Sequence, residues 1–168
     1  MIGKQRISRK SYGGFTVIEL MITASLAILL TSVGTPTMVT AVHNSQVRTT
    51  TNDLFASLHL ARSESIKRNG ITTVVANSGG WAYGWSIRSG ATVIRQQDAI
   101  EDLTITTISA GVTSIVFDAE GRATNTSAVT LVVSKTNSSA MIKCITLSST
   151  QRAFVLSDKD YDGDCTNG

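Results

Sequence analysis

The chain opens with a polar, basic stretch and then changes abruptly to an apolar one. Residues 15–35 are largely apolar, and Glu19 carries their only charge. At about 1.5 Å per residue, a helix of this length reaches roughly 30 Å, which matches the hydrocarbon core of a bilayer. The pattern therefore predicts a transmembrane helix that begins near Phe15.

The apolar pattern continues beyond this run in a different form. After Pro36 the apolar positions recur at spacings of three to seven residues, which is typical of an amphipathic helix. The expected buried stripe consists of Val42, Val47, Leu54, Leu58, Ala61 and Ser65, broadened by Phe55 and Ile66. Asn69 and Gly70 form a helix stop. We predict one helix over residues 15–68, kinked at Pro36 because proline removes a helix hydrogen bond.

Beyond Gly70 the helical period disappears, and short β-prone runs alternate with turn signals. Eight strands are predicted, at residues 71–76, 83–87, 91–95, 103–109, 114–118, 129–134, 141–147 and 153–156. Their hairpin spacing predicts antiparallel sheets packed against the second half of the helix, which is an α+β fold. Trp81, Tyr83 and Trp85 alternate along one expected strand, so we expect them to share one face and to pack in the core.

Charge is distributed unevenly along the chain. The formal net charge is +3, from 15 Lys plus Arg against 12 Asp plus Glu. Four of the basic residues lie in the first ten positions, so the rest of the chain has 11 basic and 12 acidic residues. Without its first segment the chain is near neutral, and it has no strong sequence-independent attraction for nucleic acid or anionic lipid.

The junction between the basic and apolar stretches resembles the type IV prepilin signature. It runs Gly-Phe-Thr-Val-Ile-Glu-Leu over residues 14–20 and follows a basic leader. The resemblance implies that a prepilin peptidase cuts between Gly14 and Phe15 and that the new N-terminal Phe15 is N-methylated. It also implies that Glu19 forms an assembly salt bridge with the N-terminal amine of a neighbouring subunit. A buried charge needs such an opposite partner.

These features predict the organisation of the chain. Residues 1–14 are the prepilin leader, 15–40 the transmembrane and assembly helix, and 41–168 a periplasmic globular domain. The positive charges before the apolar run favour a cytoplasmic N-terminus. We therefore expect a single pass through the bacterial inner membrane, followed by incorporation into a pilus on the cell surface.

Motifs within the domain narrow the family. The segments 52–70, 80–85, 115–122 and 144–148 resemble the GspH/FimT group of pilin-like proteins, which contains pseudopilins of type II secretion and minor pilins of type IV pili. Cys144 and Cys165 are the only cysteines, and an even pair in an exported protein indicates a disulfide. A C-terminus tied in this way resembles the FimU-type minor pilins most.

An aspartate-rich segment near the C-terminus offers the one candidate for a cofactor. Asp158, Asp160 and Asp162 are followed by Gly163, which is the start of a calcium-loop spacing. The chain ends before a bidentate glutamate could appear at the twelfth loop position, so a solvated turn is the alternative. No cofactor other than calcium at this loop is expected.

Nucleic-acid binding is disfavoured. The DNA-binding FimT-type minor pilins carry a Gly-Arg-x-Arg motif between late strands, and only Arg152 is kept at the matching stretch. Each lost basic group weakens contact with phosphates. The sequence also contains no nucleophile elbow, phosphate loop or paired-carboxylate site, so we do not expect an enzyme.

The predicted function is that of a minor type IV pilin, a structural subunit that primes pilus assembly and sits at or near the pilus tip. Its expected partners are the prepilin peptidase, the inner membrane, other minor pilins and the major pilin. Two alternatives stay open: a GspH-like pseudopilin of type II secretion, and a FimT-like DNA-binding minor pilin for natural transformation.

Overall fold

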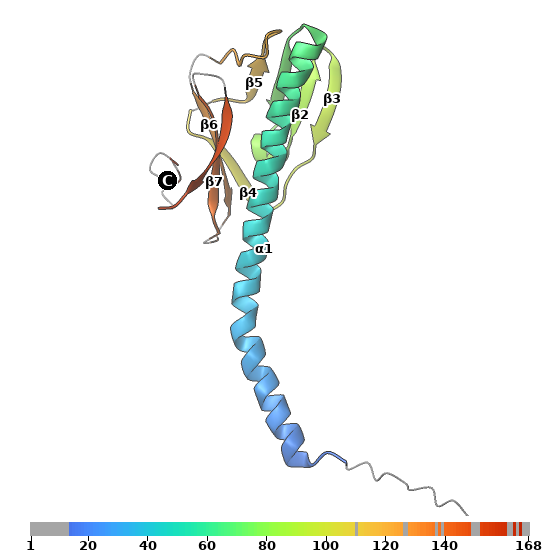
Figure 1. The fold of residues 1–168 in the computed structure, drawn as a ribbon, viewed down its shortest axis with the longest axis vertical. Coiled ribbons are helices and arrows are strands. Elements are labelled where there is room, and N and C mark those ends of the chain that lie inside the picture. The colour runs from blue at the N-terminus through green and yellow to red at the C-terminus, as the bar shows by residue number, and fades with distance from the viewer. Residues whose placement is uncertain are drawn as a thin grey trace, which may run out of the picture. The chain divides into compact units, whose positions relative to one another are not determined.

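The computed structural model describes residues 14–109, 111–125, 128–136, 138, 140–148, 152–160, 163 and 165, without the side chains of residues 32–37. The elements are α1 (Val17–Arg68), β1 (Thr72–Ala76), the 3₁₀ helix η1 (Trp81–Tyr83), β2 (Trp85–Ser89), β3 (Thr92–Gln97), β4 (Leu103–Thr107), β5 (Ser114–Phe117), β6 (Val129–Lys135), β7 (Ile142–Leu147) and β8 (Ala153–Asp158) (Figure 1). The chain forms two compact units, residues 1–38 and 39–168. The fold is α+β, as predicted.

Helix α1 ends where the sequence predicts. Asn69 adopts a left-handed conformation with φ of 48°. The Gly70 N–H donates to the Ser65 carbonyl at 3.0 Å, and the Asn69 N–H donates to the Ile66 carbonyl at 3.2 Å. These two bonds are those of a Schellman motif, which satisfies carbonyls that the last turn would otherwise leave free.

The strands form two antiparallel four-stranded sheets. Sheet A has the order β3-β2-β1-β5, and sheet B has the order β4-β6-β7-β8. In sheet A, Val74 of β1 lies opposite Ile87 of β2 on one side and Ile115 of β5 on the other. In sheet B, β4 pairs with β6, β6 with β7, and β7 with β8. Hairpins connect the last two pairs, and a longer connection through β5 joins β4 to β6. All eight predicted strands are therefore confirmed, and the structure adds their pairing.

The core lies between the C-terminal half of α1 and both sheets, as Figure 1 shows. Two indoles fix its polar contacts. The Trp85 Nε1–H donates to the hydroxyl of Ser57 on α1 at 2.9 Å, and the Trp81 Nε1–H donates to the Val112 carbonyl at 2.8 Å. Both rings are buried. Because a buried indole N–H needs an acceptor, the Trp85 bond fixes β2 on the helix, and the Trp81 bond fixes η1 against the loop before β5.

Two details of the predicted packing are wrong. Trp81 and Tyr83 do not lie on a strand with Trp85, because residues 81–83 form η1 and β2 begins only at Trp85. Trp81 is buried there, whereas Tyr83 is 59% exposed. Val42 and Ile66 are also outside the buried stripe, each 53% exposed, although Val47, Leu54, Leu58, Ala61 and Ser65 are buried as expected. Helical spacing alone does not show how far the sheets extend along α1.

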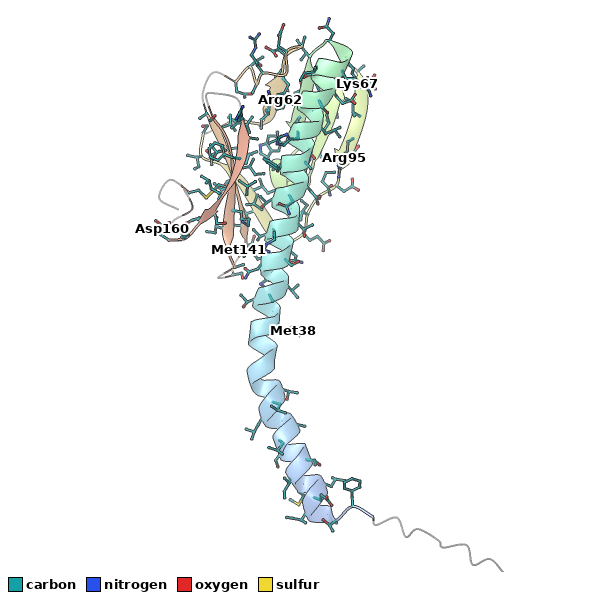
Figure 2. All side chains as sticks on the ribbon, viewed as in Figure 1. Met38, Arg62, Lys67, Arg95, Met141 and Asp160 are labelled. Carbon is teal, nitrogen blue, oxygen red and sulfur yellow. A yellow bond between two sulfur atoms is a disulfide. The ribbon has the colours of Figure 1, made fainter. Side chains whose placement is uncertain are left out.

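Polar contacts join α1 to the β6–β7 hairpin. The Met141 N–H donates to Asn44 Oδ1 at 2.8 Å, and His43 Nδ1 lies 3.0 Å from the Ser138 hydroxyl. The Lys135 Nζ donates to Gln46 Oε1 at 3.2 Å. Figure 2 shows Met141 beside α1. These bonds place the hairpin against one stretch of the helix, residues 43–46.

A compact turn follows β5. Asp118 Oδ1 accepts hydrogen bonds from the N–H groups of Glu120 (3.1 Å) and Arg122 (2.7 Å), and its Oδ2 accepts from Arg122 Nε at 3.1 Å. These hydrogen bonds, chiefly that from the backbone of Arg122, lower the pKa of Asp118 below its usual 3.8. The carboxylate therefore closes the turn in its ionised form.

The turn gives a testable pH dependence. Because the folded pKa of Asp118 lies below the unfolded value, its contribution to stability is present above pH 3.8 and is lost as the pH falls through the folded pKa. We expect Asp118→Asn to lower the midpoint of thermal unfolding at pH 7, and the difference from the wild type to shrink below pH 4. A difference independent of pH between 7 and 2.5 would contradict this role.

Candidate functional sites

The predicted cleavage junction lies directly before α1. Gly14, Phe15 and Thr16 precede the helix, and Glu19 is in its first turn. The Glu19 N–H donates to the Thr16 hydroxyl at 3.3 Å, and the Thr16 N–H donates to Glu19 Oε2 at 3.5 Å. This reciprocal pair is a capping box, which satisfies two of the free N–H groups at a helix start.

The sequence carries the Thr-x-x-Glu signal of a capping box at residues 16–19, but this capping box was not predicted from it. The structure thus gives Glu19 a role within its own subunit. Its carboxylate lies against the backbone of Thr16, one residue from the amine that cleavage before Phe15 would create. A negative charge in the first turn also complements the helix dipole.

The fold gives no reason for a glycine at position 14. A Cβ added there would meet no atom within 4 Å. Gly14 is also absent from the positive-φ backbone positions of the described residues. The glycine is therefore not required by local packing or by backbone conformation.

The first half of α1 presents apolar side chains on all of its sides. Phe15 is 83% exposed, and the exposed large apolar residues that follow it are Val17, Ile18, Leu20, Met21, Ile22, Leu26, Ile28, Leu29 and Leu30. A helix that is apolar all round needs to be covered by other apolar groups. Within the residues that the structure describes, however, no helix is long and apolar enough to cross a membrane.

Two predictions about this segment stay predictions. The leader, residues 1–14, lies outside the described residues except for Gly14. The backbone is helical through residues 32–37, but their side chains are not described, so the kink at Pro36 is not tested.

The Cys144–Cys165 disulfide is present, with Cα atoms 6.3 Å apart. It joins β7, the penultimate strand, to the C-terminal segment, as predicted. Cys165 is buried with Cys144 and Val132 in a small cluster, against which Ile142 and Leu156 also pack. This cluster is separate from the main core. Cys165 therefore packs against apolar side chains of sheet B that lie outside the main core.

The aspartate-rich segment begins at the end of β8. Asp158 is buried, and its Oδ2 accepts a hydrogen bond from the Gly163 N–H at 2.8 Å. Asp160 is exposed, and Asp162 lies outside the described residues. Among the described residues, no three His, Cys, Asp or Glu side chains gather into a possible metal site. Asp158 thus closes the turn that leads to the disulfide, and calcium binding is a proposal.

Calcium binding can be tested by melting. If Asp158, Asp160 and Asp162 hold the ion, millimolar calcium should raise the melting midpoint, since a ligand that binds only the folded state stabilises it. Magnesium and Asp160→Asn serve as controls. An unchanged midpoint in calcium would contradict calcium binding by this loop.

Arg152, the residue matched to the DNA-binding motif, is exposed at the start of β8. The Arg152 carbonyl accepts the Ser148 N–H at 3.2 Å, which closes the turn between β7 and β8. Gly121 and Arg122 are a second partial match to that motif, and Arg122 has ion pairs with Asp118 at 3.1 Å and Glu120 at 3.2 Å. These acidic partners offset the charge that Arg122 could offer to a phosphate.

The long N-terminal helix, the two antiparallel sheets and the tied C-terminus define a pilin-like protein. The family model for the type II transport protein GspH matches residues 50–151, and the chain belongs to this family. No curated protein matches the chain.

Solved structures show the same fold. The type IV minor pilin FimU of Pseudomonas aeruginosa is similar with a TM-score of 0.60 and 22% identity, over 68% of this chain and 94% of FimU. The minor pseudopilin EpsH from the type 2 secretion system of Vibrio cholerae is similar with a TM-score of 0.53 and 11% identity, over 67% of this chain and 97% of EpsH. Pilin and pseudopilin families are structural, so this chain is a structural protein and not an enzyme.

Proposed function

We propose that the chain is a minor type IV pilin that helps to prime pilus assembly and is placed at or near the tip. The observation that carries this proposal is the likeness to FimU, which is greater in TM-score and identity than the likeness to EpsH. A globular domain of this kind, borne on an apolar helix, suits a subunit that docks by its helix and presents its domain to other pilins. We take the other minor pilins and the major pilin as its partners.

Processing by a prepilin peptidase is supported by Gly14. Neither the packing nor the backbone conformation of the described residues requires glycine there, which leaves the position open to a role in recognition. Recognition by the peptidase would account for the glycine and places the cut before Phe15, where N-methylation would follow. We propose that the precursor is held at the inner membrane with the leader in the cytoplasm and the domain in the periplasm, and that it then enters the pilus.

Glu19 would have two successive partners. In the isolated subunit its carboxylate caps the Thr16 N–H within its own helix. In the filament, the exposed apolar side chains around it become covered by neighbouring helices, and a carboxylate in that environment needs a cation. The methylated amine of a neighbouring Phe15 would provide that charge.

The pair Thr16 and Glu19 allows a sharp test. In the bacterium that carries the gene, we expect Glu19→Gln to remove the chain from sheared pili, since the amide cannot neutralise an amine. Thr16→Val breaks the capping box but keeps the carboxylate, so it should lower incorporation only slightly. The measurement is the amount of subunit that co-purifies with pili, normalised to the amount in the membrane fraction.

The comparison of the two variants decides the role of the carboxylate. Equal incorporation of Glu19→Gln and wild type would overturn the salt bridge. Equal loss in both variants would show that Glu19 acts only as a helix cap. Mass spectrometry of the purified subunit, with Gly14→Val as control, should find a methylated Phe15 at the N-terminus of the wild type alone.

The likeness to EpsH favours one alternative, a pseudopilin of type II secretion. A deletion strain separates the two systems. Loss of surface pili with normal secretion of exoproteins supports the minor pilin, whereas the reverse phenotype supports the pseudopilin.

A further inference from the structure

A hollow beside β4 lies apart from the cleavage junction, the disulfide and the aspartate-rich segment. Its volume is about 560 Å³, and it lies between η1, residues 99–102 and the edge strand β4. This volume is within the usual range for ligand clefts, about 300–1,000 Å³. Trp81, Ile100, Leu103 and Ile105 give it apolar walls, and the exposed Tyr83 ring lies at its border.

The backbone of β4 turns hydrogen-bonding groups toward this side. The Thr136 N–H donates to the Asp102 carbonyl at 3.3 Å, and the Ile108 N–H donates to the Thr130 carbonyl at 3.0 Å. Asp102 and Ile108 flank β4 on its two sides, and both are even-numbered residues that bond toward β6. Because antiparallel pairs alternate, Thr104 and Thr106 bond to β6. The N–H and C=O groups of Leu103 and Ile105 therefore point to the opposite edge.

That edge has no partner strand among the described residues, since β4 is the outermost strand of sheet B. No hydrogen bond from the described part of the chain reaches the outward groups of Leu103 or Ile105. Both residues are nonetheless buried. Buried backbone groups are nearly always paired, so these require water or an added chain.

The border of the hollow is acidic. Asp98, Glu101 and Asp102 lie in the connection between β3 and β4. Of these three, Glu101 and Asp102 line the hollow. The Lys135 Nζ lies 3.3 Å from Asp102 Oδ2 and offsets that charge, and Glu101 is exposed. A surface with this excess of negative charge attracts a basic partner and disfavours an acidic one.

The acidic connection is held in place before any partner arrives. The Lys135 side chain is 6% exposed and contacts both Asp102 and Gln46 of α1. It thereby ties the connection to β6 and to the helix. A binding surface that is already ordered loses little conformational entropy when a partner docks.

We infer that this hollow binds an extended, basic segment of a neighbouring pilin-like subunit, which adds to the free edge of β4 as a short strand. The inference rests on the proposed function for the kind of partner. The Leu103 and Ile105 backbone groups would pair with the segment, one apolar side chain would enter between Tyr83 and Ile100, and a lysine or arginine would meet Glu101. Addition of a strand to a free edge is a known mode of peptide recognition.

The test uses three peptides with blocked ends and the full-length chain in a mild detergent. The probe is KVTVTVK. The first control, EVTVTVE, reverses its charge, and the second carries N-methyl groups on its valines, which removes backbone donors. We expect the probe to shift the amide resonances of Leu103 and Ile105 and to change the fluorescence of Trp81. Both control peptides should bind at least about tenfold more weakly.

Matched variants of the protein test the acidic border. Glu101→Lys should weaken the probe about tenfold and strengthen EVTVTVE. Glu120→Lys, at an exposed glutamate that does not line the hollow, should leave both affinities unchanged. Absence of amide shifts at Leu103 and Ile105, or equal binding of the N-methylated peptide, would overturn the inference. This outcome would leave the pilus assay with Glu19→Gln unaffected, so the two proposals can fail separately.

Discussion

Gly84→Ala should destabilise the domain by about 2–6 kcal/mol, which is a large part of the typical stability of a protein of this size. Gly84 ends η1 with φ of 95° and ψ of 179°, a conformation that is essentially restricted to glycine and costs other residues about 1–3 kcal/mol. A Cβ would also overlap the Gln97 carbonyl oxygen and would lie 2.8 Å from the Asp98 carbonyl carbon. Because both are backbone atoms, relief requires β3 to move away from β2, and such overpacking costs about 1–3 kcal/mol more.

The chain offers a matched control at the other end of η1. Gly80 has nearly the same conformation, with φ of 110° and ψ of −176°, but a Cβ there would meet nothing within 4 Å. Gly80→Ala should therefore show only the backbone strain, about 1–3 kcal/mol. Denaturant unfolding followed by tryptophan fluorescence measures both. Equal losses in the two variants would mean that the close approach of Gln97 does not constrain Gly84.

Removal of the disulfide should cost about 3 kcal/mol. Cys144 and Cys165 are 21 residues apart, and a crosslink over a loop of this length lowers the entropy of the unfolded chain by roughly that amount. Once the bond is gone, the described contacts of the C-terminal segment include the small apolar cluster and the hydrogen bond from Gly163 to Asp158. We expect the double variant Cys144→Ala, Cys165→Ala to unfold at a lower denaturant concentration than the oxidised wild type.

Reduction of the wild type provides the control for this variant. Dithiothreitol should lower its unfolding midpoint to nearly that of the double variant and should leave the variant itself unchanged. A midpoint of the wild type that does not respond to reductant would show that the noncovalent contacts of Cys165 are sufficient to hold the segment.

Local patterns were sufficient for most of the secondary structure. The helix begins two residues after its predicted start at residue 15, and it ends at Arg68 as predicted, because Asn69 and Gly70 form the stop. All eight strands overlap their predicted ranges, because β-prone runs and turn residues alternate regularly after Gly70. The capping box of Thr16 and Glu19 was also within reach of the sequence, since it depends on residues three apart.

The sequence by itself therefore determined the helix, the strands, the cleavage motif and the pair of cysteines, since each depends on neighbouring residues or on a short motif. Only the tertiary structure decided which strands are edges, where the sheets leave α1 exposed at Val42 and Ile66, and how Gly84 turns Tyr83 away from β2. It also decided that Leu103 and Ile105 line a hollow and that their outward backbone groups have no hydrogen-bond partner among the described residues. These features arise from contacts between residues far apart in the chain, and no local periodicity encodes them.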